Sequence, residues 1–187
     1  MPMKSRALVG GLRRPEGFSL VELLVVVAIL AILVGFGAST LATKKGAEVA
    51  QAGGLVSDLA NLARQHALSK NTKTILVVAQ IPGSGGTHSA VSIWDAATTN
   101  QLERWNMLPQ SVVATNTSGF VLTTFPCTYR GTSVSSGDCY VFFPDGRMGD
   151  NLNQRPKLEV RARNGNSDNF YELVFNPLTG LTKVNRP

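Results

Sequence analysis

The chain has 187 residues, enough for one folded domain after an N-terminal segment, and its formal net charge is +6. Half of that excess lies in residues 1–17, which hold four basic residues and one acidic residue, so the overall charge is not by itself evidence for nucleic-acid binding. The chain has only two cysteines and two histidines, at spacings that exclude an ordinary zinc site, and we expect no metal and no cofactor.

Residues 1–17 form a short basic segment that ends at Gly17, directly before a long apolar run. Positive charge next to an apolar span stays on the cytoplasmic side of a membrane. An ordinary secretory signal is cut after its apolar segment. Here the small residue precedes the apolar segment, so a cut after Gly17 removes only the basic leader.

Residues 18–41 are apolar except for one charged residue, Glu22. A helix of about 20 apolar residues spans a bilayer, so we expect a membrane-spanning helix here. A carboxylate in such a span costs roughly 2–3 kcal/mol at mid-bilayer and less near the interface, so it needs a partner. A cut between Gly17 and Phe18 creates an ammonium group four residues before Glu22, which is about one helical turn.

Residues 42–70 are predicted to continue the helix in amphipathic form. Apolar residues recur there at steps of three and four, which predicts one buried face. The face consists of Val49, Ala52, Val56, Leu59, Leu62, Ala63 and His66. The pair Gly53-Gly54 costs roughly 1 kcal/mol per glycine relative to alanine, so we expect the helix to be weakest there.

Residues 71–187 change to strand-like patterns interrupted by turns rich in glycine and proline. The expected strands are Thr72–Ile81, Ala90–Trp94, Leu102–Met107, Val112–Thr115, Phe120–Phe125, Tyr140–Phe143, Leu158–Arg163, Phe170–Phe175 and Leu181–Val184. The fold class is therefore α+β: a long N-terminal helix packed on an antiparallel β domain.

The segment Gly17–Leu24 reads Gly-Phe-Ser-Leu-Val-Glu-Leu-Leu and follows a basic leader. It resembles the type III signal of type IV pilins and pseudopilins. The resemblance implies that a prepilin peptidase cuts after Gly17 and methylates Phe18. It also implies that Glu22 compensates the N-terminal charge of a neighbouring subunit in a filament.

The second part of the chain resembles minor pseudopilins of the GspH/FimT type, through Leu62–Ala67, Phe142–Arg147 and Asn176–Gly180. The resemblance implies two small sheets packed on the helix, and only Ser118–Cys139 departs from the family pattern. It implies a structural and assembly subunit of a type II secretion pseudopilus or a type IV pilus. Such a subunit crosses the bacterial inner membrane once and places residues 71–187 in the periplasm.

Cys127 and Cys139 are the whole cysteine supply. In an oxidising periplasm we expect a disulfide between them, with two free thiols as the alternative. The bridge would close a short loop rich in serine, glycine and threonine, and it would contribute roughly 3 kcal/mol at best.

The sequence contains no pattern typical of a catalytic site. His66 lies on the apolar helix face, where a packed histidine is expected, and His88 follows a glycine-rich loop that lacks the ending of a phosphate-binding loop. No nucleophile elbow accompanies the many serines. We expect no enzyme activity and no catalytic residue.

A basic strand suggests an alternative function. Arg155, Lys157, Arg161 and Arg163 precede or lie on one predicted strand, and the last three share a face with Glu159. Clustered basic residues bind phosphate, and some FimT-type minor pilins are implicated in DNA uptake. The alternative to a DNA-binding face is an ordinary solvated one, on which charges suppress aggregation at the sheet edge.

Overall fold

The computed structural model describes residues 19–83, 85–118, 125–134, 137–149, 153, 155–164 and 169–186, and within the helix only the backbone of residues 34–45. The chain divides into two compact units, Met1–Leu41 and Ala42–Pro187. Within the described ranges, no helix combines the length and the apolarity that a membrane crossing requires.

Helix α1 spans Leu20–Lys70 and ends at Asn71, whose φ of 51° is left-handed and stops helical hydrogen bonding. Its buried face in the second unit matches the predicted stripe from Val49 to Ala63. Ala60 and Ala67 are also fully buried, whereas Leu62 and His66 are only half-buried. The small side chains on this face let strands approach the helix closely.

The first sheet is antiparallel with strand order β3-β2-β1-β7. Its strands are β1 (Thr74–Gly83), β2 (Gly86–Asp95), β3 (Gln101–Met107) and β7 (Gly137–Phe142). Strand β1 is a nearly continuous apolar run, as expected for a strand that is covered on both faces. Seven of its ten residues are buried.

The second sheet is antiparallel with strand order β10-β9-β8-β4. Its strands are β4 (Val112–Asn116), β8 (Lys157–Ala162), β9 (Phe170–Phe175) and β10 (Thr182–Asn185). Burial alternates along β8 and β9, so this sheet has one inner face and one solvent face.

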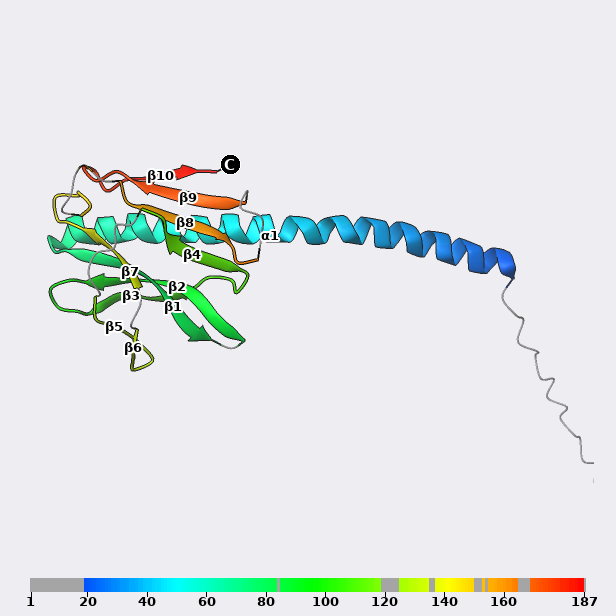
Figure 1. Ribbon diagram of the computed structural model, residues 1–187, viewed down its shortest axis with the longest axis horizontal. Coiled ribbons are helices and arrows are strands. Elements are labelled where there is room, and N and C mark those ends of the chain that lie inside the picture. The colour runs from blue at the N-terminus through cyan, green and yellow to red at the C-terminus, as the bar shows by residue number, and fades with distance from the viewer. Residues whose placement is uncertain are drawn as a thin grey trace, which may run out of the picture. The chain divides into compact units, whose positions relative to one another are not determined.

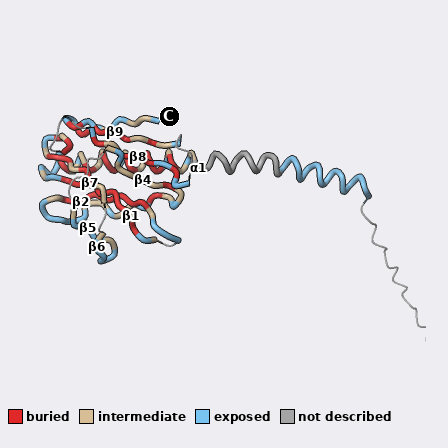
Figure 2. The backbone as a smooth tube through the Cα atoms, viewed as in Figure 1, coloured by how far each residue is buried: buried red, intermediate tan, exposed pale blue. Residues whose placement is uncertain are grey.

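One core joins the second half of α1 to the inner faces of both sheets (Figures 1 and 2). Phe175 of β9 lies at its centre, with ring centroids 5.2 Å from Tyr140 and 6.3 Å from Phe142 of β7. The predicted α+β class with two sheets packed on a helix is confirmed.

A short hairpin, β5 (Cys127–Tyr129) and β6 (Thr132–Val134), covers the outer face of the first sheet. Its two-residue turn, Arg130-Gly131, has φ values of 49° and 79°, which suit a tight hairpin. The Trp105 indole N–H donates to the Thr128 carbonyl at 2.9 Å and ties the hairpin to β3. The sequence predicted no strands here, and the predicted strand Phe120–Phe125 lies outside the described residues except for Phe125, which is not in a strand.

Candidate functional site

The start of α1 is closed by a reciprocal pair of hydrogen bonds between Ser19 and Glu22. The Ser19 amide donates to Glu22 Oε2 at 2.9 Å, and the Glu22 amide donates to Ser19 Oγ at 3.2 Å. This arrangement is a capping box, which satisfies two amide groups that a helix start leaves unpaired. It turns the Glu22 carboxylate back toward Ser19, at the N-terminal end of the helix.

From Leu20 to Leu33 the helix presents large apolar side chains to the outside. The large apolar residues from Leu20 to Leu33 are 49–80% exposed (Figure 2). Exposed apolar surface of this extent marks a region that is covered by another apolar phase or by partner chains.

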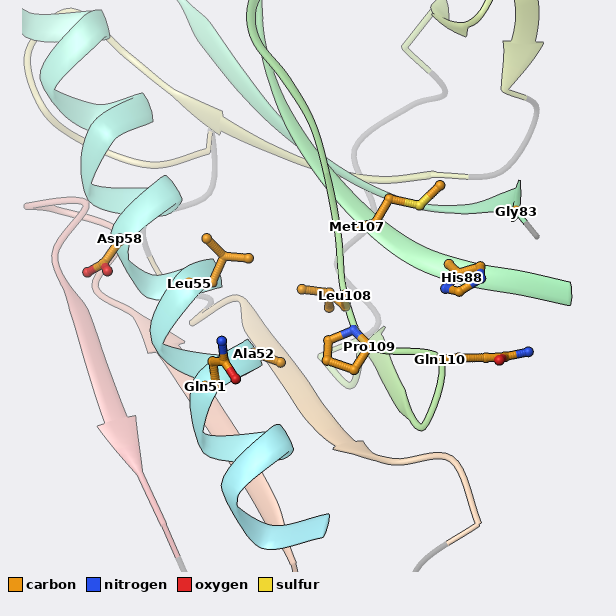
Figure 3. A pocket seen from close by; sticks show the side chains of 10 residues that line it. All are labelled: Gln51, Ala52, Leu55, Asp58, Gly83, His88, Met107, Leu108, Pro109 and Gln110. Atoms are coloured by element: carbon orange, nitrogen blue, oxygen red, sulfur yellow. The ribbon is translucent and has the colours of Figure 1, made fainter. Parts of the chain in front are cut away.

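A groove of about 650 Å³ lies between α1 and the end of the first sheet (Figure 3). Helix residues such as Leu55 form one wall, and Met107–Gln110 with His88 form the other. Figure 3 shows the Asp58 side chain turned away from His88, so the only carboxylate and the only imidazole of the lining do not face each other. Among the described residues of the lining, no nucleophile and base stand in a catalytic arrangement.

The predicted basic face lies on the solvent side of β8, but its charge is largely compensated. Lys157 Nζ donates to Glu172 Oε1 of the neighbouring strand β9 at 3.0 Å. Arg161 lies 3.6 Å from the Glu159 carboxylate on its own strand. The hydrogen bonds that Asn185 and Lys157 donate lower the pKa of Glu172, so this carboxylate stays ionised beside Lys157.

Arg163 is held by two backbone carbonyls, and its guanidinium forms no ion pair with any acidic residue that the structure describes. Its guanidinium donates to the Gln110 carbonyl at 3.2 Å and to the Thr87 carbonyl at 2.9 Å, which ties β8 to the first sheet. Arg155 is exposed before β8. The four residues therefore do not form one uncompensated patch, and DNA binding by this face stays a prediction.

Cys127 and Cys139 lie in the same apolar cluster, between the hairpin and the outer face of the first sheet. Both are buried and both are free thiols in the structure. The disulfide expected between Cys127 and Cys139 stays a prediction.

Comparison with known proteins adds to this geometry. Residues 12–38 match the family described as the prokaryotic N-terminal methylation motif. The fold is similar to the crystal structure of the type IV minor pilin FimU from Pseudomonas aeruginosa strain PAO1, with a TM-score of 0.51 and 14% identity over 76% of this chain and 91% of that chain. The chain thus combines a prokaryotic N-terminal methylation motif with a pilin-like fold.

A second crystal form of FimU has a TM-score of 0.47 to the pilin-like chain, with 14% identity over 72% of this chain and 90% of that one. No match is found among curated protein sequences. The likeness to FimU concerns the fold, and the methylation motif concerns the N-terminal segment.

Of the residues predicted for processing and assembly, the structure describes Glu22 at the helix start, whereas Gly17 and Phe18 lie outside the described residues. The prediction missed the role of Ser19. Its signal was present in the sequence, since Ser-x-x-Glu before an apolar run is typical of a capping box.

Proposed function

We propose that this pilin-like chain is a minor structural subunit of a type IV pilus or of a type II secretion pseudopilus. In this proposal a prepilin peptidase removes residues 1–17 and methylates Phe18. The observation that carries the proposal is the methylation motif at residues 12–38, joined to a domain with the fold of a minor pilin.

The proposed assembly step uses the first half of α1. Before assembly the apolar side chains from Leu20 to Leu33 lie in the inner membrane, and in the filament they pack against other subunits. Their exposure in the isolated chain supports this role, because apolar surface of this extent needs a cover.

Glu22 is proposed to meet an N-terminal ammonium group of a neighbouring subunit where water is scarce. An unpaired charge in such surroundings is strongly unfavourable, by roughly 3–5 kcal/mol for a broken buried pair. The capping box with Ser19 supports this role, because it already directs the carboxylate toward the N-terminal end of the helix.

The proposed topology places the leader in the cytoplasm and the folded unit in the periplasm. The four basic residues in the leader support this orientation. The proposed partners are the prepilin peptidase, other pilins of the filament and, before assembly, the inner membrane.

Intact-mass measurement and N-terminal sequencing of the membrane-extracted protein, made with and without a prepilin peptidase, test the proposal. We expect a chain that starts at N-methyl-Phe18 only when the peptidase is present. The variant Gly17→Leu is the matched control, and we expect it to keep residues 1–17. A wild-type chain that keeps its leader in the presence of the peptidase would overturn the proposal.

Deletion of the protein in its own host then separates the two machines. Loss of surface pili with normal protein secretion assigns the subunit to a type IV pilus. Loss of secretion with normal pili assigns it to a pseudopilus.

A further inference from the structure

Three exposed leucines gather at one end of the second unit. Among the described residues after 45, four large apolar side chains are more than a third exposed: Leu68 (42%), Met107 (38%), Leu178 (64%) and Leu181 (52%). Single exposed apolar residues are normal on a protein surface. Three of these four, however, come from two chain segments that meet at the same place.

Contacts through two glycines show that the segments meet. A methyl group on Gly146 would lie 3.4 Å from Leu68 Cδ2, near the end of α1. A methyl group on Gly180 would lie 2.5 Å from the Gly146 carbonyl oxygen. The end of α1, the turn after β7 and the turn between β9 and β10 are therefore in direct contact (Figure 1).

The turn that carries Leu178 and Leu181 is fixed from several sides. Arg64 of α1 donates from Nε to the Thr179 carbonyl at 2.6 Å. Asn176 Oδ1 accepts from the Leu178 amide at 2.9 Å, and Gly180 has a φ of 63°. Both leucines are thus held in the solvent by a pre-organised turn, which lowers the entropy cost of binding a partner.

Basic residues outnumber acidic ones in the three segments that meet at the leucines. The segments 64–73, 143–149 and 176–181 contain four basic residues and one acidic residue, Asp145. Lys73 Nζ and Arg147 Cζ each lie 4.6 Å from the Phe143 ring centroid, which stabilises both cations in place. Arg147 Nε lies 2.9 Å from Asp145 Oδ2, so the single anion compensates only one of the four cations.

We infer that the leucine–arginine patch, formed by Leu68, Leu178, Leu181, Arg64 and Arg147 with Lys70 and Lys73 at its rim, docks an acidic amphipathic segment of another filament subunit. Apolar side chains of the partner cover the leucines, and its carboxylates meet the basic rim. The inference rests on the proposed function, because that function supplies the class of partner.

The chemistry of the patch favours a protein over nucleic acid or lipid. Leucines add nothing to phosphate binding or to base stacking, which needs exposed aromatic rings, and Phe143 is buried. Arg64 is held by a backbone carbonyl, and Arg147 by an aromatic ring and by Asp145. Such pre-positioned guanidinium groups suit carboxylates at a defined place. Diffuse attraction to an anionic lipid surface would not need this positioning.

The test uses the full chain in phosphatidylcholine nanodiscs and a fluorescent synthetic helical peptide about 15–20 residues long, with leucines on one face and glutamates on the other. Anisotropy measures its dissociation constant. We expect saturable binding that weakens about tenfold or more in Leu178→Ser/Leu181→Ser and in Lys70→Glu/Lys73→Glu, all exposed positions.

Met107→Ser and Arg104→Glu are the matched controls, because both residues are exposed on β3, outside the patch. We expect both to bind the peptide like the wild type. The inference would be overturned if a control variant weakened binding as much as the patch variants did, or if a peptide with lysines in place of the glutamates bound equally well. The absence of binding up to about 1 mM peptide would also overturn it. Displacement of the peptide by phosphatidylglycerol vesicles or by short DNA would overturn the inference that the partner is a protein.

N-terminal processing, measured on the same variants, separates this inference from the proposed function. Normal processing with no peptide binding would contradict only the docking role of the patch. Peptide binding by a chain that the prepilin peptidase does not cut would contradict the proposed function and still support binding at the patch.

Discussion

Burial controls the chemistry of the two cysteine thiols. Cys127 and Cys139 are 2% and 3% exposed, between the β5–β6 hairpin and the first sheet. Burial raises the pKa of Cys127 to about 11, with a further contribution from the nearby Cys139 thiol, and it raises the pKa of Cys139 as well. Because the thiolate is the reactive form, both thiols are unreactive at neutral pH in the reduced, folded chain.

We expect iodoacetamide to label the reduced folded protein at pH 8 far more slowly than the same protein in guanidinium chloride, as followed by intact mass. The raised pKa values also make the folded state bind more protons than the unfolded state between about pH 9 and pH 11. The reduced protein should therefore lose stability as pH rises through that window. Labelling at equal rates in the two states would contradict the burial.

Asp138, on the edge strand β7, carries a half-buried carboxyl group. It accepts a hydrogen bond from the Asn116 amide of β4 at 3.1 Å and so links the two sheets. Burial raises its pKa above 3.8, and the Asn116 hydrogen bond only partly opposes that shift. The ionised form is therefore disfavoured in the folded state, and the penalty grows as pH rises through the folded pKa.

Asp138→Asn should accordingly raise the melting temperature at pH 7, by up to a few degrees, since an asparagine oxygen can still accept the Asn116 hydrogen bond. Near pH 3, where the wild-type carboxyl is protonated, the two proteins should melt together. A lower melting temperature of the variant at pH 7 would show that the ionised carboxylate stabilises the sheet contact.

At the scale of the elements, the two glycines in the middle of α1 have different roles. A methyl group on Gly53 would lie 2.8 Å from Tyr171 Cδ2 and still closer to Cγ and Cδ1, whereas one on Gly54 would meet nothing within 4 Å. The helix is continuous across both residues. Gly53 is therefore the place where β9 approaches the helix, and only Gly54 is simply tolerated.

We expect Gly53→Ala to destabilise the folded unit, because overpacking costs about 1–3 kcal/mol and exceeds the gain in helix propensity. Gly54→Ala is the matched control and should stabilise by up to about 1 kcal/mol, since alanine is the better helix former. Denaturant unfolding of the two full-length variants measures both effects. Stabilisation by both substitutions would show that helix propensity, and not the Tyr171 contact, determines the effect at Gly53.

Local sequence signals predicted most of the elements in the described chain. The long helix, its buried stripe and eight of the strands follow from period and turn residues, and β9 is found with its predicted bounds, Phe170–Phe175. In each of these elements the apolar residues follow the period of the secondary structure that it forms, so each could be recognised without its neighbours.

What the sequence did not predict depends on contacts between distant residues. The β5–β6 hairpin has three-residue strands of mostly polar residues, and the Trp105 indole and the outer face of the first sheet hold it in place. The compensation of Lys157 likewise depends on Glu172, which the register of β8 with β9 places opposite Glu159 and within hydrogen-bond reach of Lys157. The close approach of Tyr171 to Gly53 is a third example.

At the scale of the whole molecule, substitutions at Glu22 and Ser19 separate two roles of the Glu22 carboxylate. Its carboxylate caps α1 through Ser19 and is proposed to pair with an ammonium group of another subunit. Glutamine at the same position can keep a capping box but carries no charge. Ser19→Ala removes the hydroxyl that accepts the Glu22 amide hydrogen bond and keeps the carboxylate.

We therefore expect Glu22→Gln to insert into the membrane and to be processed to Phe18 like the wild type, yet to be missing from sheared filaments, because the ammonium is left without its counter-charge. Ser19→Ala should enter filaments, with at most a loss of about 1 kcal/mol in helix stability. Immunoblots of the membrane and filament fractions measure both. If Glu22→Gln is incorporated and Ser19→Ala is not, the helix cap and not the charge pair is what assembly requires.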